Sequence, residues 1–258
     1  MSEQEWKTAI TDIGENKINL RGYPIDKLMG KASFAQVTYL AIFGELPDEK
    51  TGRMLDAILV SSVDHGVTPP SILSALTVAS TGASLSASIA AGIMSINRFH
   101  GGAIENCMKM LCEAVTRQKD ENKSTAEAAS ELITVYRAAK KTLFGYGHRI
   151  HSRDPRTVKL FALAKELGFY GPTVQMAVAV EQEIPKVMGA ELPLNVDGAI
   201  GAVLCELKVP PELSNAFFIL SRTAGIIAHV HEEHKREKAM RVIDPAGWEY
   251  DGPPQREP

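Results

Sequence analysis

Residues 145–149 read Gly145-Tyr146-Gly147-His148-Arg149, an imidazole held between glycines at the mouth of an apolar segment. Two further stretches have the same character, Phe99-His100-Gly101-Gly102 and Leu194-Asn195-Val196-Asp197-Gly198. A neighbouring glycine lets the backbone approach a ligand closely and tolerates a positive φ. Each stretch alone is also compatible with an ordinary loop that carries a solvated polar tip. Together, two imidazoles and one carboxylate form a set suited to proton transfer at carbon and oxygen.

Length and composition restrict the class of protein. The chain has 258 residues, of which 45% are hydrophobic, and this is enough for one domain or for two unequal ones. Its 28 basic and 31 acidic residues give a formal net charge of −3. Because there is no excess of positive charge, we expect neither a nucleic-acid partner nor an anionic membrane.

The N-terminal residues lack a basic stretch followed by an apolar run, so we expect no signal peptide. The most apolar tract, residues 76–96, is interrupted by Ser, Thr and Gly and is too polar for a membrane-spanning helix. The cysteines are odd in number, and Cys107, Cys112 and Cys205 all fall in predicted buried helices. These features favour a reduced, cytoplasmic location with structural thiols over a disulfide framework.

Helical periodicity dominates the chain and predicts an all-α protein. Ser33 has the position of an N-cap, Gln36 that of its capping-box partner, and Gly44 ends the helix. Strand signal is nearly confined to residues 17–20, a short piece suited to a hairpin. The expected helices cover residues 34–43, 55–63, a segment beginning at Pro69-Pro70-Ser71, 84–97, 103–117, 124–141, 154–167, 172–187, 198–204 and 211–237.

Short motifs occur in a characteristic order along nearly the whole chain. They are Ala9-Ile10-Thr11-Asp12-Ile13, Leu20-Arg21-Gly22-Tyr23-Pro24-Ile25, Phe43-Gly44-Glu45-Leu46-Pro47, Asp64-His65-Gly66, Ala87-Ser88-Ile89-Ala90-Ala91-Gly92-Ile93, the three stretches quoted above, Asp154-Pro155-Arg156 and Ser221-Arg222-Thr223-Ala224-Gly225. In this order they resemble the motifs of the citrate synthase superfamily. The resemblance implies a discontinuous large domain for dimerisation, residues 1–101 and 209–258. It also implies a smaller, mobile, CoA-binding domain, residues 102–208.

The chain is more compact than full-length citrate synthases. Only a short segment separates Pro47 from Asp64, where those enzymes carry an additional helical block. This layout is similar to that of citryl-CoA lyases and of the citrate-synthase-homology module of ATP-citrate lyase. In that module a glycine stands where this chain has His100. The sequence therefore combines a synthase-like histidine with a lyase-like length.

The resemblance implies catalytic roles for His100, His148 and Asp197. The family reaction forms or cleaves the bond between the acetyl-CoA methyl carbon and the keto carbon of oxaloacetate. His148 is expected at the hydroxyl or keto oxygen, His100 as a hydrogen-bond donor to the thioester oxygen, and Asp197 as the group that exchanges the proton at carbon. An imidazole beside a developing oxyanion stabilises it strongly in a site that excludes water. For Asp197, the alternative is a helix N-cap, because a helical segment follows it.

Substrate carboxylates require fixed positive charge. Arg156, Arg222 and Arg241 match the carboxylate-binding arginines of the family, with His65 as a further donor, and an arginine fork grips a carboxylate through two parallel hydrogen bonds. The alternatives are that Arg156 pairs locally with Asp154 and that Arg241 lies on a solvated face of the last helix. By the same resemblance, CoA lies along the turn formed by Gly145, Tyr146, Gly147 and Arg149, with Arg149 or Arg153 at its phosphates.

The preferred function is that of a citryl-CoA lyase, which uses no metal or redox cofactor. The alternatives are a minimal citrate synthase, which also hydrolyses the thioester, and a non-enzymatic CoA-binding relic of the fold. A metal site at His231-Glu232-Glu233-His234 is disfavoured because its histidines are three apart, one short of the zinc-protease spacing. The resemblance also implies a homodimer, or a dimer of dimers, in which Arg241 reaches the site of a neighbouring subunit.

Overall fold

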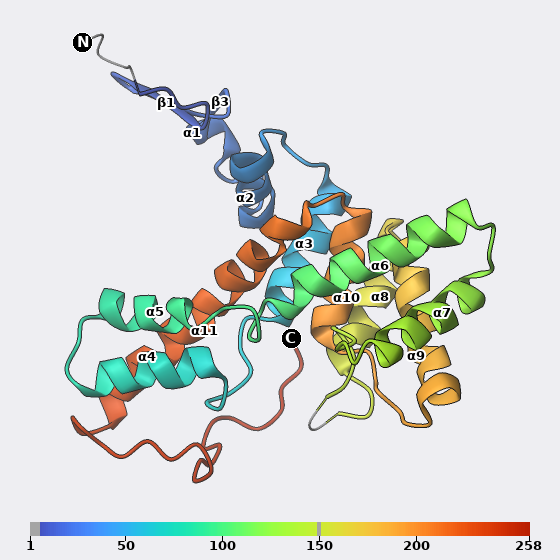
Figure 1. Ribbon diagram of the computed structural model, residues 1–258. Coiled ribbons are helices and arrows are strands. Elements are labelled where there is room, and N and C mark those ends of the chain that lie inside the picture. Colours follow the sequence, from blue (N-terminus) through green and yellow to red (C-terminus); the bar gives the residue numbers. More distant parts are fainter. Residues whose placement is uncertain (1–5, 149–150) are drawn as a thin grey trace, which may run out of the picture.

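The computed structural model describes residues 6–148 and 151–258, which form packed helices and one small sheet (Figure 1). The strands are β1 (Thr11–Gly14), β2 (Lys17–Leu20) and β3 (Tyr23–Pro24). The helices are α1 (Ile25–Leu28), α2 (Phe34–Phe43), α3 (Glu49–Ser61), α4 (Pro70–Ser80), α5 (Leu85–Met94), α6 (Ala103–Asp120), α7 (Thr125–Ala138), α8 (Pro155–Leu167), α9 (Pro172–Met188), α10 (Val196–Glu206), the 3₁₀ turn η1 (Pro211–Leu213) and α11 (Ser214–Arg236). The predicted all-α class is confirmed, with the addition of this N-terminal sheet.

Local capping signals determine where several helices begin and end. The Ser33 hydroxyl accepts the N–H of Gln36 at 3.2 Å, and the Gln36 side chain accepts the N–H of Ser33 at 3.0 Å. Gly44 ends α2 in the left-handed conformation, with φ of 89°, which a glycine adopts without steric cost. The predicted limits of α2 are therefore confirmed.

Two helices begin well away from the predicted residue, and α10 begins two residues before it, at Val196. α3 starts at Glu49, well before the predicted residue 55, because the Asp48 carboxylate accepts the N–H of Thr51 at 2.7 Å and caps the helix there. The segment from Pro211 first forms the 3₁₀ turn, and α11 begins only at Ser214. Both differences lie at helix ends, where short-range capping outweighs hydrophobic periodicity.

The predicted hairpin is confirmed and is part of a three-stranded antiparallel sheet in the order β1-β2-β3. Ile13 lies opposite Ile18, and the tight turn between the strands places Asn16 at φ of 54°. With α1, this sheet projects away from the other helices at the upper left of Figure 1. Ile13 remains 73% exposed, so the projecting arm buries little of its own apolar surface.

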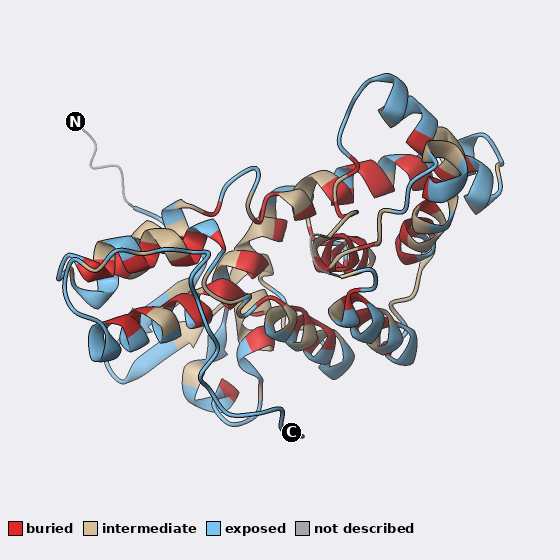
Figure 2. Cartoon of the chain, turned by 90° about the horizontal axis from the view of Figure 1, so that it is seen from below, coloured by how far each residue is buried: buried red, intermediate tan, exposed pale blue. Residues whose placement is uncertain are grey.

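Buried side chains form two clusters (Figure 2). The larger joins α6, α7, α8, α9 and α10 to α3 and to the first turns of α11. The smaller contains α4 together with Ile226 and Val230 of α11, and Ile89 and Ile93 of α5 pack against it. Because α11 contributes to both clusters, it connects the two predicted domains; their boundaries and relative movement stay a prediction.

One described stretch, Pro211–Arg236, is long and apolar enough to cross a membrane by length and composition alone. The same criterion is met by core helices of globular proteins. In this fold the stretch includes α11, where Phe217, Ile226 and Val230 are buried against other helices and Arg222 is buried midway along. Its apolar faces are thus already used in the two clusters.

The turn at residues 145–147 packs directly against the start of α10 because both sides carry a glycine. A Cβ atom added to Gly145 would lie 2.6 Å from the Cα of Gly198, and one added to Gly198 would lie 2.5 Å from the carbonyl oxygen of Gly145. Gly145 also has φ of +85°, a region that other residues rarely adopt. Two of the three quoted stretches are therefore held together by glycine-to-glycine contact.

We expect Gly198→Ala to destabilise the protein by about 1–3 kcal/mol, because the added methyl group overpacks this contact. The matched control is Gly14→Ala, where the nearest atom is 3.9 Å from the added Cβ, so little change is expected. Urea denaturation of both variants measures the difference. Equal stability of the two variants would contradict the importance of this contact.

Candidate active site

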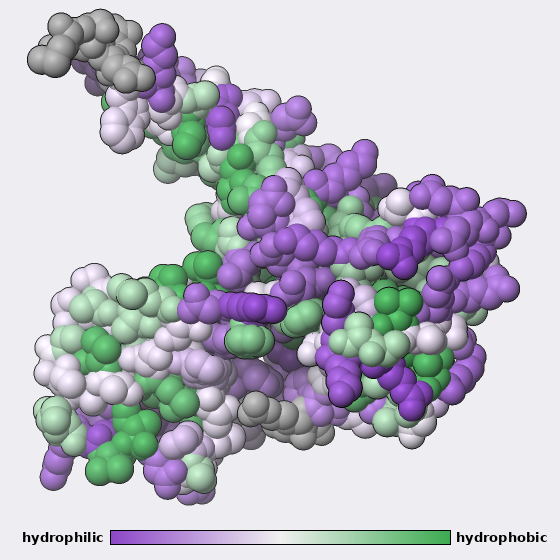
Figure 3. Space-filling model, in the orientation of Figure 1, coloured by the Kyte–Doolittle hydropathy of each residue, from purple (hydrophilic) through white to green (hydrophobic). Residues whose placement is uncertain are grey.

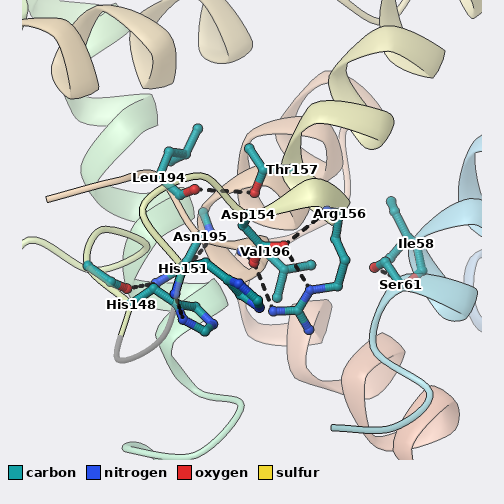
Figure 4. Close-up of polar contacts among 12 residues, drawn as sticks. Ile58, Ser61, His148, His151, Asp154, Arg156, Thr157, Leu194, Asn195 and Val196 are labelled. Carbon is teal, nitrogen blue, oxygen red and sulfur yellow. Dashed lines mark hydrogen bonds and ion pairs between the residues drawn. The ribbon is translucent and has the colours of Figure 1, made fainter.

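The carboxylate of Asp154 organises the centre of the candidate site (Figure 4). It is buried, and it caps α8 by accepting the N–H of Arg156 at 3.0 Å. The Arg156 guanidinium donates to both carboxylate oxygens, at 3.0 and 2.8 Å, and the N–H of Val196 donates at 3.2 Å. Burial opposes the charge, but the hydrogen bonds from Arg156 outweigh it and hold the pKa of Asp154 below its ordinary value. Asp154 therefore fixes Arg156 and joins the starts of α8 and α10.

His148 lies between two other imidazoles. Its ring centroid is 4.5 Å from that of His151 and 5.9 Å from that of His65. The backbone N–H of His151 donates to His148 Nδ1 at 3.0 Å. Because Nδ1 acts as an acceptor, the proton of the neutral His148 ring lies on Nε2. Burial, and then the neighbouring His151, lower the pKa of His148. The ring is thus prepared as a neutral hydrogen-bond donor.

His100 is held by a contact that joins it to α4. Its Nε2 lies 2.8 Å from the hydroxyl oxygen of the buried Ser71, and its ring meets that of Phe218 edge to face at 5.6 Å. Burial, with a further contribution from the charge of Arg222, lowers the pKa of His100 to about 4. The imidazole is therefore neutral at pH 7. When Ser71 donates to Nε2, the ring proton lies on Nδ1.

Asp197 lies in the first turn of α10. The N-cap of that helix is Asn195, whose side-chain oxygen accepts the N–H of Gly198 at 3.2 Å. The alternative of Asp197 as the cap is therefore wrong, because Asn195 already occupies the position. Burial raises the pKa of Asp197 to about 6, and the charges of Arg156 and Arg222 oppose this shift only in part. A carboxyl group with such a pKa exchanges protons near neutral pH.

Arg222 is buried within α11 without a carboxylate in direct contact among the described residues. Its Nε donates to the carbonyl oxygen of Ser62 at 3.1 Å, and its guanidinium carbon lies 4.9 Å from the centre of the Phe218 ring. Burial lowers its pKa, whereas Asp64 and Asp197 favour its charged form. Arg222 thus gives the site a fixed positive charge that a substrate carboxylate can neutralise.

Arg241 lies beyond the last helix, not on it as expected, because α11 ends at Arg236. Its guanidinium forms a paired contact with the buried carboxylate of Glu233, at 2.8 and 2.7 Å. Arg222 and Glu233 belong to the same helix and are about 16 Å apart along its axis at 1.5 Å per residue. Arg241 is therefore remote from the residues that surround Arg222 in its own chain.

The predicted CoA-binding turn is tightly tied to the start of α10. Gly147 donates its N–H to Pro193 O at 2.7 Å, and the carbonyl of Gly145 accepts the N–H of Asn195 at 2.9 Å. The side chain of Tyr146 is buried and donates to the carbonyl of Ala177 at 3.0 Å. The side chain of Tyr146 is therefore part of the core and does not contribute to a binding surface.

The basic residues expected beside this turn are only partly described. Arg149 lies outside the described residues. Arg153 lines a cavity of about 220 Å³ with Thr157 and Phe161. A larger groove of about 670 Å³ runs between α3 and α8 and reaches Asp64 and Arg156. Among residues 6–148 and 151–258, no group of three or more His, Cys, Asp or Glu side chains is arranged to hold a metal ion.

Three residues at the site were not predicted to contribute to it. His151 supports His148, Ser71 holds His100, and Asp64 accepts from the distant His229 at 3.1 Å. The partner of Asp64, His229, comes from α11. Sequence spacing carries no signal for such contacts, because Ser71 and His100 are 29 residues apart and belong to different segments.

This helical fold and its histidine-aspartate site have known counterparts. The family pattern "Citrate synthase, C-terminal domain" matches residues 48–243. The chain therefore belongs to the citrate synthase family.

The chain is similar to one solved structure over nearly the full length of both chains and to part of a longer one. Citryl-CoA lyase from Hydrogenobacter thermophilus is 41% identical, with a TM-score of 0.83 over 98% of this chain and 96% of that one. ATP citrate lyase from Methanothrix soehngenii shares the fold at 21% identity, with a TM-score of 0.83, over 99% of this chain and 43% of its own.

Longer curated relatives are named citrate synthases. Citrate synthase from Heyndrickxia coagulans is 30% identical over 224 residues, which are 84% of this chain and 57% of that protein. Citrate synthase from Haloferax volcanii is 30% identical over 203 residues, 51% of its length. The chain thus spans little more than half the length of the curated relatives that it matches.

We expect Asp154→Asn to destabilise the protein by about 2–4 kcal/mol, because an amide cannot accept all the donors that meet this buried carboxylate. The folded-state pKa of Asp154 is lowered, so its contribution to stability is present at neutral pH and is lost as the pH falls below the ordinary carboxyl range. The difference between wild type and variant should therefore shrink in acid. Denaturation at pH 7 and at about pH 3 measures it; a difference that grows in acid would contradict this role.

Proposed function

We propose that this chain is a citryl-CoA lyase that cleaves citryl-CoA into acetyl-CoA and oxaloacetate. The observation that carries the proposal is the likeness to the Hydrogenobacter citryl-CoA lyase, which extends over almost the full length of both chains. The acid–base groups that such a reaction needs are all present, as His100, His148 and Asp197. Neither a metal nor a redox cofactor takes part in this proposal.

Cleavage moves one proton off oxygen and one onto carbon. His148 contacts the C3 hydroxyl of citryl-CoA. As the carbon–carbon bond breaks, the hydroxyl proton passes to the unprotonated Nδ1 of His148, which releases the backbone N–H of His151, and the ring becomes an imidazolium. The electron pair of that bond passes into the acetyl-CoA enolate. The Nδ1–H group of His100 donates a hydrogen bond to the enolate oxygen. The neutral state of His100 supports this role, because burial and Arg222 keep its pKa near 4.

Asp197 supplies the proton to the enolate carbon. Its raised pKa of about 6 keeps a fraction of the carboxyl protonated near neutral pH, as an acid in this step requires. In the reverse direction the same group removes a proton from the acetyl-CoA methyl. The two carboxylates of the citryl group are matched by Arg156 and Arg222, with His65 as a further donor. The backbone of the turn at Gly145–Gly147 and the side chains of Arg149 and Arg153 are proposed to bind CoA.

The alternative is a minimal citrate synthase that condenses the same products and hydrolyses the thioester. Two observations favour it. His100 is retained, and the curated relatives at 30% identity are named citrate synthases. The short internal segment between Pro47 and Asp64 favours the lyase, since the additional helical block of full-length citrate synthases is expected there.

Two incubations distinguish the candidates. Purified protein is mixed with citryl-CoA, and separately with acetyl-CoA and oxaloacetate, and the products are separated by chromatography. A lyase cleaves citryl-CoA to acetyl-CoA without releasing free CoA. Release of CoA from the second mixture at a comparable rate would identify a synthase, and no reaction in either mixture would leave only the non-enzymatic alternative.

His100→Ala and Asp197→Asn should each lower kcat for citryl-CoA cleavage by about a hundred- to a thousand-fold, because each removes a group that acts on the developing enolate. His234→Ala is the matched control, since His234 is exposed near the end of α11. Circular dichroism confirms that the variants are folded. Near-normal turnover by His100→Ala would assign the thioester hydrogen bond to another group.

We also propose that the active form is a homodimer or a dimer of dimers. Large apolar side chains remain exposed in two regions, the arm together with the start of α2, and the end of α5, as Ile13 at 73%, Phe34 at 73% and Met94 at 78% show. Apolar surface is visible over both regions in Figure 3. Patches of this kind mark interfaces between chains. Because Arg241 lies far from Arg222 in its own chain, it serves a site of the neighbouring subunit in this proposal.

Mixing inactive Arg241→Ala with inactive His148→Ala chains tests this arrangement. If Arg241 acts in trans, mixed dimers contain one site with both wild-type residues, and about half the activity per mixed dimer returns relative to wild type. Subunit exchange is verified by native mass spectrometry. Mixed dimers without recovered activity would place the action of Arg241 in its own subunit.

A further inference from the structure

Two cysteine thiols meet between α6 and α10, away from the acid–base residues. The Sγ atoms of Cys112 and Cys205 are 3.0 Å apart, although the residues are separated by 93 positions in sequence. All three cysteines of the chain are reduced in this structure. A disulfide bond is about 2.05 Å long, so an approach of about 1 Å would join these two sulfurs.

The surroundings allow such an approach. α6 and α10 are in close contact where Gly201 faces α6: a Cβ added there would lie 3.2 Å from Ile104 O and 3.4 Å from the side chain of Met108. Cys112 and Cys205 lie beyond this contact along both helices, and both are partly exposed. Cys107, in contrast, is fully buried beneath Gly145. A small oxidant can therefore reach the pair but not the third thiol.

The two thiols have different acidities. The two thiols share one hydrogen bond. When Cys112 is ionised, Cys205 can donate its S–H to the thiolate, and this interaction lowers the pKa of Cys112 below its ordinary value, against the opposing effect of burial. The same hydrogen bond and burial raise the pKa of Cys205. Cys112 is thus the thiol that more readily forms a thiolate, the reactive form of cysteine.

We propose that Cys112 and Cys205 form a reversible oxidation site that responds to hydroperoxides and links α6 to α10 by a disulfide. The Cys112 thiolate attacks one oxygen of hydrogen peroxide, the O–O bond breaks, and the other oxygen leaves as hydroxide. The sulfenic acid formed on Cys112 is then attacked by Cys205, which loses its proton as the S–O bond breaks and water leaves. In total, two thiols and one peroxide give one disulfide and two waters, and a dithiol reductant reverses the change.

The disulfide would stabilise the folded protein and would not inhibit the active site. α10 carries Asp197 at its start, and α6 follows the His100 turn, so both helices lead away from the site toward the cysteines. Closing a loop of this length restricts the unfolded chain far more than the folded one. The linked protein should therefore resist unfolding, while the geometry at the starts of both helices is preserved.

Treatment of the full-length protein with a small excess of hydrogen peroxide tests the proposal. Intact mass should fall by two hydrogens, and peptide mapping without reduction should recover Cys112 joined to Cys205. The midpoint of thermal unfolding should rise by about 5 °C or more and return on addition of dithiothreitol. Cys107→Ala is the control, since it retains the pair and should form the same link.

Two variants test the order of the steps. With Cys205→Ser, Cys112 should stop at the sulfenic acid and react with dimedone, whereas the wild type should give no such adduct. With Cys112→Ser, oxidation of Cys205 should be slower than oxidation of Cys112 in the Cys205→Ser variant, because burial still raises the pKa of Cys205 and keeps its thiolate scarce.

Other outcomes would overturn the proposal. They are no oxidation at these residues, a link between different chains or to Cys107, and an internal link that leaves the unfolding midpoint unchanged. These readouts are masses and unfolding temperatures, so they are independent of which reaction the enzyme catalyses.

Discussion

The buried carboxylate of Asp154 is the interaction on which the arrangement of the site depends. It accepts one backbone N–H from the start of α8 and another from the start of α10, and it holds the Arg156 fork in a fixed plane. A charge buried to this extent persists only when hydrogen bonds replace its hydration. The same bonds that stabilise the carboxylate therefore orient the guanidinium of Arg156 and join two helix termini.

Around Asp154, burial and positive charge shift the pKa values of the acid–base groups: the pKa of His100 is lowered, and the pKa of Asp197 is raised. The fixed charge of Arg222 helps to keep His100 neutral, and burial carries the pKa of Asp197 upward to about 6. A neutral imidazole donates a hydrogen bond without a proton transfer, and a carboxyl group of this acidity gives and takes protons near pH 7. The environment thus assigns different tasks to groups that the sequence presents only as ionisable.

Small residues permit the close contacts that bring these groups together. Gly145 and Gly198 let the imidazole-bearing turn rest on the start of α10, and Gly201 lets α10 approach α6. The contact between Cys112 and Cys205 lies further along the same pair of helices. The turn at residues 145–147, the carboxylate of Asp197 and the thiol pair therefore belong to one packed unit, in which α10 is the common element.

The sequence by itself determined the helical class, most helix limits and the family. Capping and periodicity act between residues a few positions apart, so Ser33, Gln36 and Gly44 specify α2 without reference to the rest of the chain. The ordered motifs likewise indicate which residues belong to the site, His100, His148 and Asp197 among them. Even so, the N-cap of α10 was assigned correctly only in the structure, since Asn195 and Asp197 are both chemically suited to it.

Tertiary structure alone decided the partners of these groups. The contacts of Ser71 with His100 and of His229 with Asp64 arise because separate segments pack together. The contact of Glu233 with Arg241 arises because the chain reverses beyond the end of α11. Burial, and with it the proton affinity of each group, is likewise a property of the assembled helices. The identity of a side chain defines which chemistry is possible. Its dielectric environment and its contact geometry are decided only in the folded protein, where segments distant in sequence pack together and exclude water.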